Sequence, residues 1–127
     1  MSNYRPECVV LQCGADCIVG DHLGGFNLTP DTLSDCVKDV LAYNLPVLIL
    51  GGGGYNHINT AKCWTAITAA AVGEILDDDI PEDDQYFEDY GPDFQLKISP
   101  GCVRNRNIEV QIDKLLALVK ENVGKIN

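Results

Sequence analysis

Several features that would assign a function at once are missing from this sequence. No apolar run approaches the roughly 20 residues that a membrane helix needs, and the first six residues form no apolar signal segment. The six cysteines include no C-x-x-C pair, which argues against a structural zinc knuckle. We therefore expect an intracellular protein whose cysteines are reduced and mostly buried as small hydrophobic residues.

Basic residues are also scarce. The chain has nine Lys and Arg against 19 Asp and Glu, and its net charge is −10. Nine of the carboxylates lie between Asp77 and Asp93, a stretch without Lys or Arg. Since the rest of the chain is nearly neutral, direct binding of nucleic acid is disfavoured. The acidic stretch has two interpretations, a solvated loop or a surface that attracts basic partners such as lysine-rich tails.

The apolar pattern predicts an α/β protein. Continuous apolar runs at 8–11 and 47–50 are typical of parallel strands buried on both faces. Thr29 and Pro30 begin a helix that ends near Asn44, with Cys36 among its apolar positions. Asn59 caps a second predicted helix, whose apolar face runs from Trp64 to Ile75.

Further along the chain, the pattern predicts a short strand at 94–98 and a terminal amphipathic helix marked by Ile112 to Val123. The β-α-β-α order implies a parallel sheet with helices on both faces. Two strands are too few to close such a sheet, which indicates that the sequence is part of a larger domain.

Two loops follow the predicted strands, and ligands bind at this end of parallel sheets. The first loop carries Asp16, and the second carries Gly51 to Gly54 followed by Tyr55. Asp16 could bind a metal or work as an acid or base, but such a residue also commonly stabilises a turn. The glycine run is either a mobile turn or a loop that lets the Tyr55 phenol reach a developing oxyanion.

Other sites of chemistry are poorly supported. The glycine run is not a phosphate loop, because no Gly-Lys-Ser or Gly-Lys-Thr follows it. His22 and His57 could be a general base or a ligand, but a single loop histidine is more often a surface residue. The sequence contains no H-x-x-x-H pair and no G-x-S-x-G elbow.

Several short segments of the sequence resemble those of class I histone deacetylases. They are Gln12 to Asp16, Gly20-Asp21, Phe26 to Pro30, Leu48 to Asn56, Asn59 to Thr65 and Tyr90 to Asp93, in the family's order and spacing. Asn59 to Thr65 and Ser99 to Cys102 are most similar to the type-eight branch. The resemblance covers nearly the whole chain, although Lys62 replaces a usual Arg and His22 a usual Pro or Arg.

The resemblance implies the C-terminal part of an arginase/deacetylase-type three-layer α/β/α catalytic domain, here residues 1–127, with the upstream two-thirds absent. It implies zinc-dependent hydrolysis of acetyl-lysine, with Asp16 as one of three metal ligands. Tyr55 would hydrogen-bond the substrate carbonyl oxygen, and Gly53 and Leu23 would line the acyl-lysine channel. The other ligands and a catalytic histidine pair belong to the family's upstream part, so we expect the chain alone to be inactive.

The resemblance also implies partners and a place in the cell. The substrates would be acetylated lysine peptides such as histone tails, and corepressor proteins would be further partners. A chromatin regulator and transcriptional repressor of this kind would act in the nucleus and cytoplasm, without binding a membrane or nucleic acid directly. The alternative is a truncated, non-catalytic interaction module or an incomplete gene product.

Overall fold

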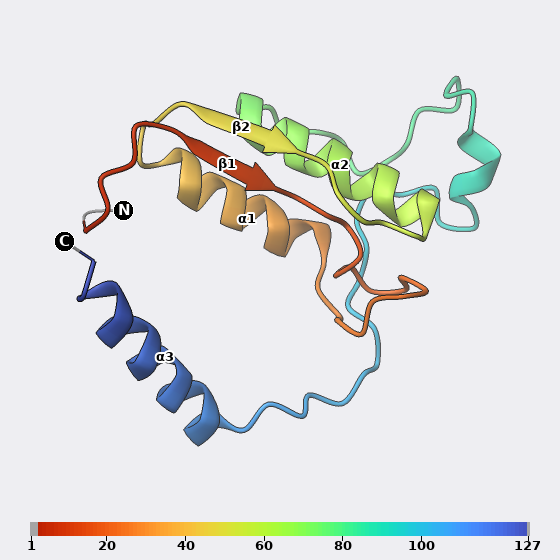
Figure 1. Ribbon diagram of the computed structural model, residues 1–127. Coiled ribbons are helices and arrows are strands. Elements are labelled where there is room, and N and C mark those ends of the chain that lie inside the picture. Colours follow the sequence, from red (N-terminus) through yellow and green to blue (C-terminus); the bar gives the residue numbers. More distant parts are fainter. Residues whose placement is uncertain (1–2, 127) are drawn as a thin grey trace.

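A computed structural model describes residues 3–126 as one small parallel sheet, two packed helices and a separate terminal helix (Figure 1). The longer elements are β1 (Val9–Gln12), α1 (Pro30–Leu41), β2 (Val47–Leu50), α2 (His57–Val72) and α3 (Glu109–Val123), with a short 3-10 helix η1 at Phe87–Tyr90. The two strands predicted at 8–11 and 47–50 and the three predicted helices are present, with boundaries shifted by a few residues. The α/β class is therefore confirmed.

The two strands pair in parallel through the α1 crossover. Val9 lies opposite Val47 and Gln12 opposite Leu50. Thr29 occupies the N-cap position of α1, with Pro30 in the first turn. The Thr29 hydroxyl does not bond to the backbone of the first turn; it lies 3.2 Å from the Thr32 hydroxyl.

Both packed helices lie on the same face of the sheet. Leu11 and Ile49, neighbours in the register, pack against the core formed with α1 and α2. The alternate residues Val10, Leu48 and Leu50 point to the other face and are exposed, at 64%, 57% and 43%. Residues 3–126 therefore supply two of the layers expected for the larger α/β fold, and the second face of the sheet is left open.

The core is small and includes only two of the cysteines. Ile18, Val37 and Cys63 are almost completely buried, and burial raises the pKa of the Cys63 thiol to about 12. All six cysteines are free, as expected. The expectation that most are buried is wrong, because Cys8, Cys36 and Cys102 are exposed.

Helix α2 begins earlier than the sequence suggested. Its N-cap is Asn56, whose side-chain oxygen accepts a 3.1 Å bond from the Asn59 backbone N–H. His57, expected in a loop, is therefore the first helical residue. The predicted apolar face is also partly wrong: Ile67 is buried, but Val72 is 66% exposed and Ile75, beyond the helix, is 97% exposed.

The acidic segment, residues 77–93, folds back on itself, and no strand forms at 94–98. Phe94 has a positive φ of 52°, which breaks an extended run, and only one isolated antiparallel bridge joins Asp79 to Gln95. Two backbone bonds accompany it, from Ile80 N–H to the Phe94 carbonyl and from Leu96 N–H to the Asp78 carbonyl. The predicted strand at 94–98 is therefore wrong, because the backbone turns at Phe94.

Helix α3 stands apart from the rest of the fold (Figure 1). None of its residues is buried, and its apolar side chains are open to solvent, among them Leu115 at 62% and Val119 at 56%. Among residues 3–126, no helix is long and apolar enough to cross a membrane.

We expect the isolated 127-residue chain to self-associate or to lack a cooperative fold. The open sheet face and α3 both expose apolar surface, and both strands are sheet edges. Analytical ultracentrifugation, combined with a thermal unfolding scan, would measure this. A monomer with one sharp unfolding transition would contradict the prediction and show that these residues form an independent domain.

Candidate active site at the carboxyl ends of the strands

The loops that follow β1 and β2 are held together by their backbones. Beyond the sheet, Cys13 N–H donates to the Leu50 carbonyl at 2.8 Å, and Ala15 N–H donates to the Gly53 carbonyl at 2.6 Å. The parallel pairing therefore continues into both loops. It brings the Asp16 loop and the glycine loop to one edge of the sheet, as the sequence predicted.

Asp16 sits in a space that only glycines leave open. A Cβ atom added to Gly53 would overlap the Asp16 carboxylate, and one added to Gly24 would overlap the Asp16 carbonyl oxygen. Two backbone segments thus approach this residue more closely than any side chain would permit. The carboxylate is partly buried and faces the glycine loop. This placement suits a ligand or acid-base group that must be held at one position.

A second carboxylate, Asp21, fixes the backbone of Tyr55. Its Oδ2 accepts from Tyr55 N–H at 2.7 Å, and its Oδ1 accepts from the N–H groups of Leu23 and Gly24 at 2.8 Å each. Desolvation acts to raise the pKa of Asp21, but these hydrogen bonds, with one from Asn56, outweigh it and lower the pKa. Asp21 therefore stays ionised and joins the two loops.

Helix α2 holds the first loop from the other side. The Trp64 indole N–H donates to the Cys13 carbonyl at 2.8 Å, and the Asn59 amide donates to the Val19 carbonyl at 2.9 Å. The Asn56 amide donates to the Gly20 carbonyl at 3.2 Å. These side chains donate hydrogen bonds to loop carbonyl groups that lie outside the strand pairing, and they orient the segment that carries Asp16.

Asp21, Asn59 and Trp64 were not recognised as site residues from the sequence. The signal for Asp21 was available, because an Asp placed two and three residues before Leu23 and Gly24 commonly accepts their N–H groups in an Asx-type turn. Trp64 and Asn59 had no comparable signal. Their partners lie 51 and 40 residues away in sequence, so only the folded chain brings them together.

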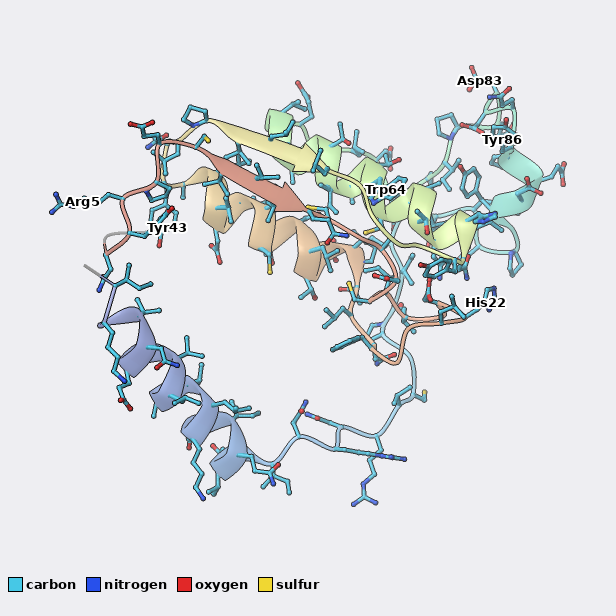
Figure 2. All side chains as sticks on the ribbon, viewed as in Figure 1. Arg5, His22, Tyr43, Trp64, Asp83 and Tyr86 are labelled. Carbon is cyan, nitrogen blue, oxygen red and sulfur yellow. The ribbon has the colours of Figure 1, made fainter. Side chains whose placement is uncertain are left out.

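The remaining predicted site residues are more open. Tyr55 is 47% exposed and Leu23 is 74% exposed, so both side chains are accessible to a partner molecule. His22 lies near the outer end of its loop and is exposed (Figure 2), while His57 begins α2. Within residues 3–126, no three His, Cys, Asp or Glu side chains gather closely enough to hold a metal ion.

Comparison with known protein families identifies the family of this chain. The model of the histone deacetylase domain matches residues 1–71, more than half of the chain. The chain therefore belongs to the histone deacetylase family.

Curated relatives extend the likeness over nearly the whole chain. Histone deacetylase 8 of Xenopus laevis is 46% identical over 98% of this chain, and that of Danio rerio is 42% identical over 97%. Probable histone deacetylase 1-B of Xenopus laevis is 46% identical over 97%. The chain spans 38%, 32% and 25% of these three relatives, respectively. It thus corresponds to a fragment of each of them.

We expect Gly24→Ala to destabilise the Asp16 loop strongly, while Gly25→Ala is nearly silent. The added methyl group at position 24 would overlap the Asp16 carbonyl, whereas nothing lies within 4 Å of a Cβ at position 25. Overpacking of this kind costs about 1–3 kcal/mol, against less than about 0.5 for an open surface site.

Urea unfolding of a complete deacetylase chain that carries these residues would measure both effects. The neighbouring Gly25→Ala variant is the control for any general effect of alanine in this loop. Equal unfolding midpoints for the two variants would show that the close approach at Gly24 is not a constraint in solution.

Proposed function

We propose that the complete protein to which this chain belongs hydrolyses acetyl-lysine in histones and other proteins, with zinc as its cofactor. Family membership supports a deacetylase in general terms. The observation that carries the specific proposal is the pairing of Ala15 with Gly53, which places the Asp16 carboxylate against the loop that ends in Tyr55. A metal ligand and an oxyanion donor need this proximity.

Asp16 is the proposed metal ligand of this chain. A catalytic zinc site takes three protein ligands and keeps one position open. Residues 3–126 offer no group of three suitable side chains. Asp16 would therefore act together with ligands from the rest of the domain, and the chain alone is expected to have neither stoichiometric zinc nor activity.

Tyr55 is the proposed hydrogen-bond donor to the substrate carbonyl oxygen. Its backbone N–H is fixed by Asp21, while its side chain remains half exposed. A phenol held in this way can donate to an oxygen as negative charge grows on it in the transition state. Gly53 would form part of the channel wall beside Asp16, and the exposed Leu23 would add an apolar surface for the acyl-lysine chain.

The partners and cellular location are parts of the same proposal. The substrates would be acetylated lysine peptides such as histone tails, and corepressor proteins would bring the enzyme to chromatin. A role as a transcriptional repressor in the nucleus and cytoplasm would follow.

A non-catalytic interaction module is the second candidate function for the chain by itself. It is favoured by the absence of a complete metal-ligand group in residues 3–126 and by the apolar surfaces of the sheet and α3. The length of the natural transcript separates the two candidates, because an enzyme requires the remainder of the domain.

In the complete protein, Asp16→Ala should abolish tight zinc binding. Loss of an anionic ligand weakens the site and leaves the metal charge less compensated. Zinc content after dialysis and titration with a fluorescent chelator would measure the affinity. Asp39→Ala, at an exposed position of α1, is the matched control. Zinc affinity within about threefold of the parent would remove Asp16 from the ligand set.

Tyr55→Phe should lower turnover of an acetyl-lysine peptide by about 10²–10³ and leave zinc in place. One lost oxyanion donor costs roughly 3–4 kcal/mol, and phenylalanine keeps the ring. The turnover number should fall more than substrate affinity, because the bond strengthens in the transition state.

Tyr43→Phe provides the control for this experiment. Tyr43 is similarly exposed, at 55%, but follows α1 at the opposite end of the strands (Figure 2). It should retain normal turnover. A Tyr55→Phe enzyme with normal turnover and normal zinc would exclude the oxyanion role.

A further inference from the structure

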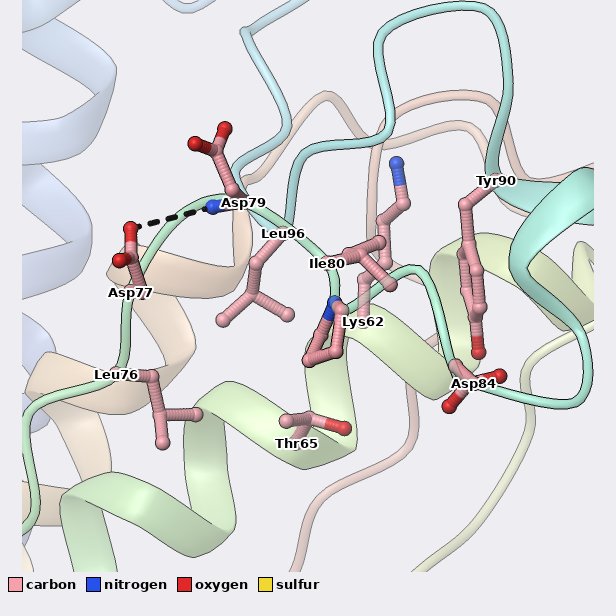
Figure 3. Close-up of a pocket in the computed structure, with 10 residues that line it drawn as sticks. Lys62, Thr65, Leu76, Asp77, Asp79, Ile80, Asp84, Tyr90 and Leu96 are labelled. Atoms are coloured by element: carbon pink, nitrogen blue, oxygen red, sulfur yellow. Dashed lines mark hydrogen bonds between the residues drawn. The ribbon is translucent and has the colours of Figure 1, made fainter.

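A cavity of about 270 Å³ lies between α2 and the acidic segment, in a part of the fold that the proposed reaction does not use (Figure 3). Four aliphatic side chains form much of its lining: Leu76, Ile80, Pro81 and Leu96. Apolar lining with a few polar groups is typical of ligand sites. A side chain of leucine size fits a space of this volume.

Backbone hydrogen bonds hold the walls of this cavity in place. Ile80 N–H donates to the Phe94 carbonyl at 2.9 Å, and Leu96 N–H donates to the Asp78 carbonyl at 2.7 Å. The rings of Phe87 and Phe94 stack with their centres 4.5 Å apart. The two segments that carry the aliphatic lining are therefore hydrogen-bonded to each other. The cavity is present without a ligand.

Lys62 is the only cation in the lining, and its charge is already countered. The residue is 6% exposed, and its Nζ lies 3.6 Å from the Asp93 carboxylate and 5.9 Å from the centre of the Tyr90 ring. Burial, followed by the negative charge of Asp84 and Asp89, raises the pKa of Tyr90. The phenol therefore stays neutral at pH 7.

Three carboxylates remain uncompensated around the aliphatic lining. Asp77 and Asp79 lie on one side of it and Asp84 on the other (Figure 3). Among the residues that the structure describes, none of the three forms an ion pair. The cavity thus presents an apolar centre between two negative sides.

We propose that this cavity binds a basic peptide segment, with one large aliphatic side chain in the cavity and lysine or arginine residues on either side of it. The aliphatic side chain would contact Leu76, Ile80 and Leu96. Its basic neighbours would face Asp77 and Asp79 on one side and Asp84 on the other. The segment needs no acetyl group, so the inference does not rest on the deacetylase reaction.

The contacts divide the recognition into two parts. Charge attraction by exposed carboxylates is long-ranged and weakened by salt. It therefore raises the rate at which the peptide meets the protein more than it contributes to selectivity. Burial of the aliphatic side chain is short-ranged and depends on the cavity itself. A peptide that has the charges without the aliphatic residue should therefore bind much more weakly than one that has both.

The test uses a fluorescently labelled seven-residue peptide with a central leucine flanked by lysines, titrated with the complete protein that carries this chain. Fluorescence anisotropy at physiological salt measures the affinity. Replacing the peptide's leucine by serine should weaken binding at least about tenfold. Replacing its lysines by glutamine should remove the dependence of the affinity on salt.

Two pairs of neighbouring variants locate the site on the protein. Leu76→Ser should weaken binding of the leucine peptide about tenfold, whereas Ile75→Ser, at a 97% exposed position outside the lining, should not. Asp84→Asn should weaken it about threefold, whereas Asp83→Asn, with the same change of charge, should not. Asparagine can still accept the bond that Asp84 receives from Tyr86 N–H, which preserves the local turn.

The outcomes separate this site from the proposed active site. Asp16→Ala and Tyr55→Phe should leave the affinity for the leucine peptide unchanged, even where they abolish deacetylation. Absence of binding, equal binding of the serine peptide, or equal effects within each variant pair would overturn the proposal. Equal binding of the serine peptide would mean that the acidic segment attracts cations without using the cavity.

Discussion

The arrangement of the proposed site depends on parallel backbone pairing that continues past the ends of the two strands. The bond from Cys13 to Leu50 is made at the last residue of β2, and the bond from Ala15 to Gly53 lies beyond the ends of both strands. They fix the two loops against each other, and the Asp21 carboxylate then adds a second link through Tyr55 N–H. Without this pairing, Asp16 and Tyr55 would be on two independent loops, and neither could be placed relative to a substrate.

Much of this arrangement followed from the sequence because it rests on local patterns. Four consecutive apolar residues at 47–50 and a similar run at 8–11 predicted the strands, and adjacent parallel strands must end at one edge. The start of α2 was placed three residues late because Asn56 and Asn59 are both good capping residues. Local preference does not distinguish them; in the structure the Asn59 amide bonds to Val19, which leaves Asn56 as the cap.

The errors arose where distant contacts decide the outcome. The apolar face of α2 was drawn through Val72 and Ile75, yet the helix buries Thr60, Lys62, Cys63 and Ile67. Periodicity assigns polar residues to the solvent, but Thr60 bonds to the Asn56 carbonyl and Lys62 lies between Asp93 and Tyr90. The Thr60 bond is local to the start of the helix. The partners of Lys62, in contrast, can cover its side chain only after the acidic segment has folded back, which no pattern within the helix records.

The acidic segment is mostly exposed, but it also encloses a cavity against α2. Ile80 of the segment and Leu96 just beyond it line this cavity, and backbone hydrogen bonds join its walls. The ammonium group of the buried Lys62 lies beside Asp93, so this carboxylate of the segment is already compensated. Helix α2 therefore contacts both the loop that carries Asp16 and the cavity. Trp64 bonds to the loop that carries Asp16, while Lys62 and Thr65 line the cavity. Because these side chains belong to a single turn of one helix, the position of α2 sets the geometry of both regions.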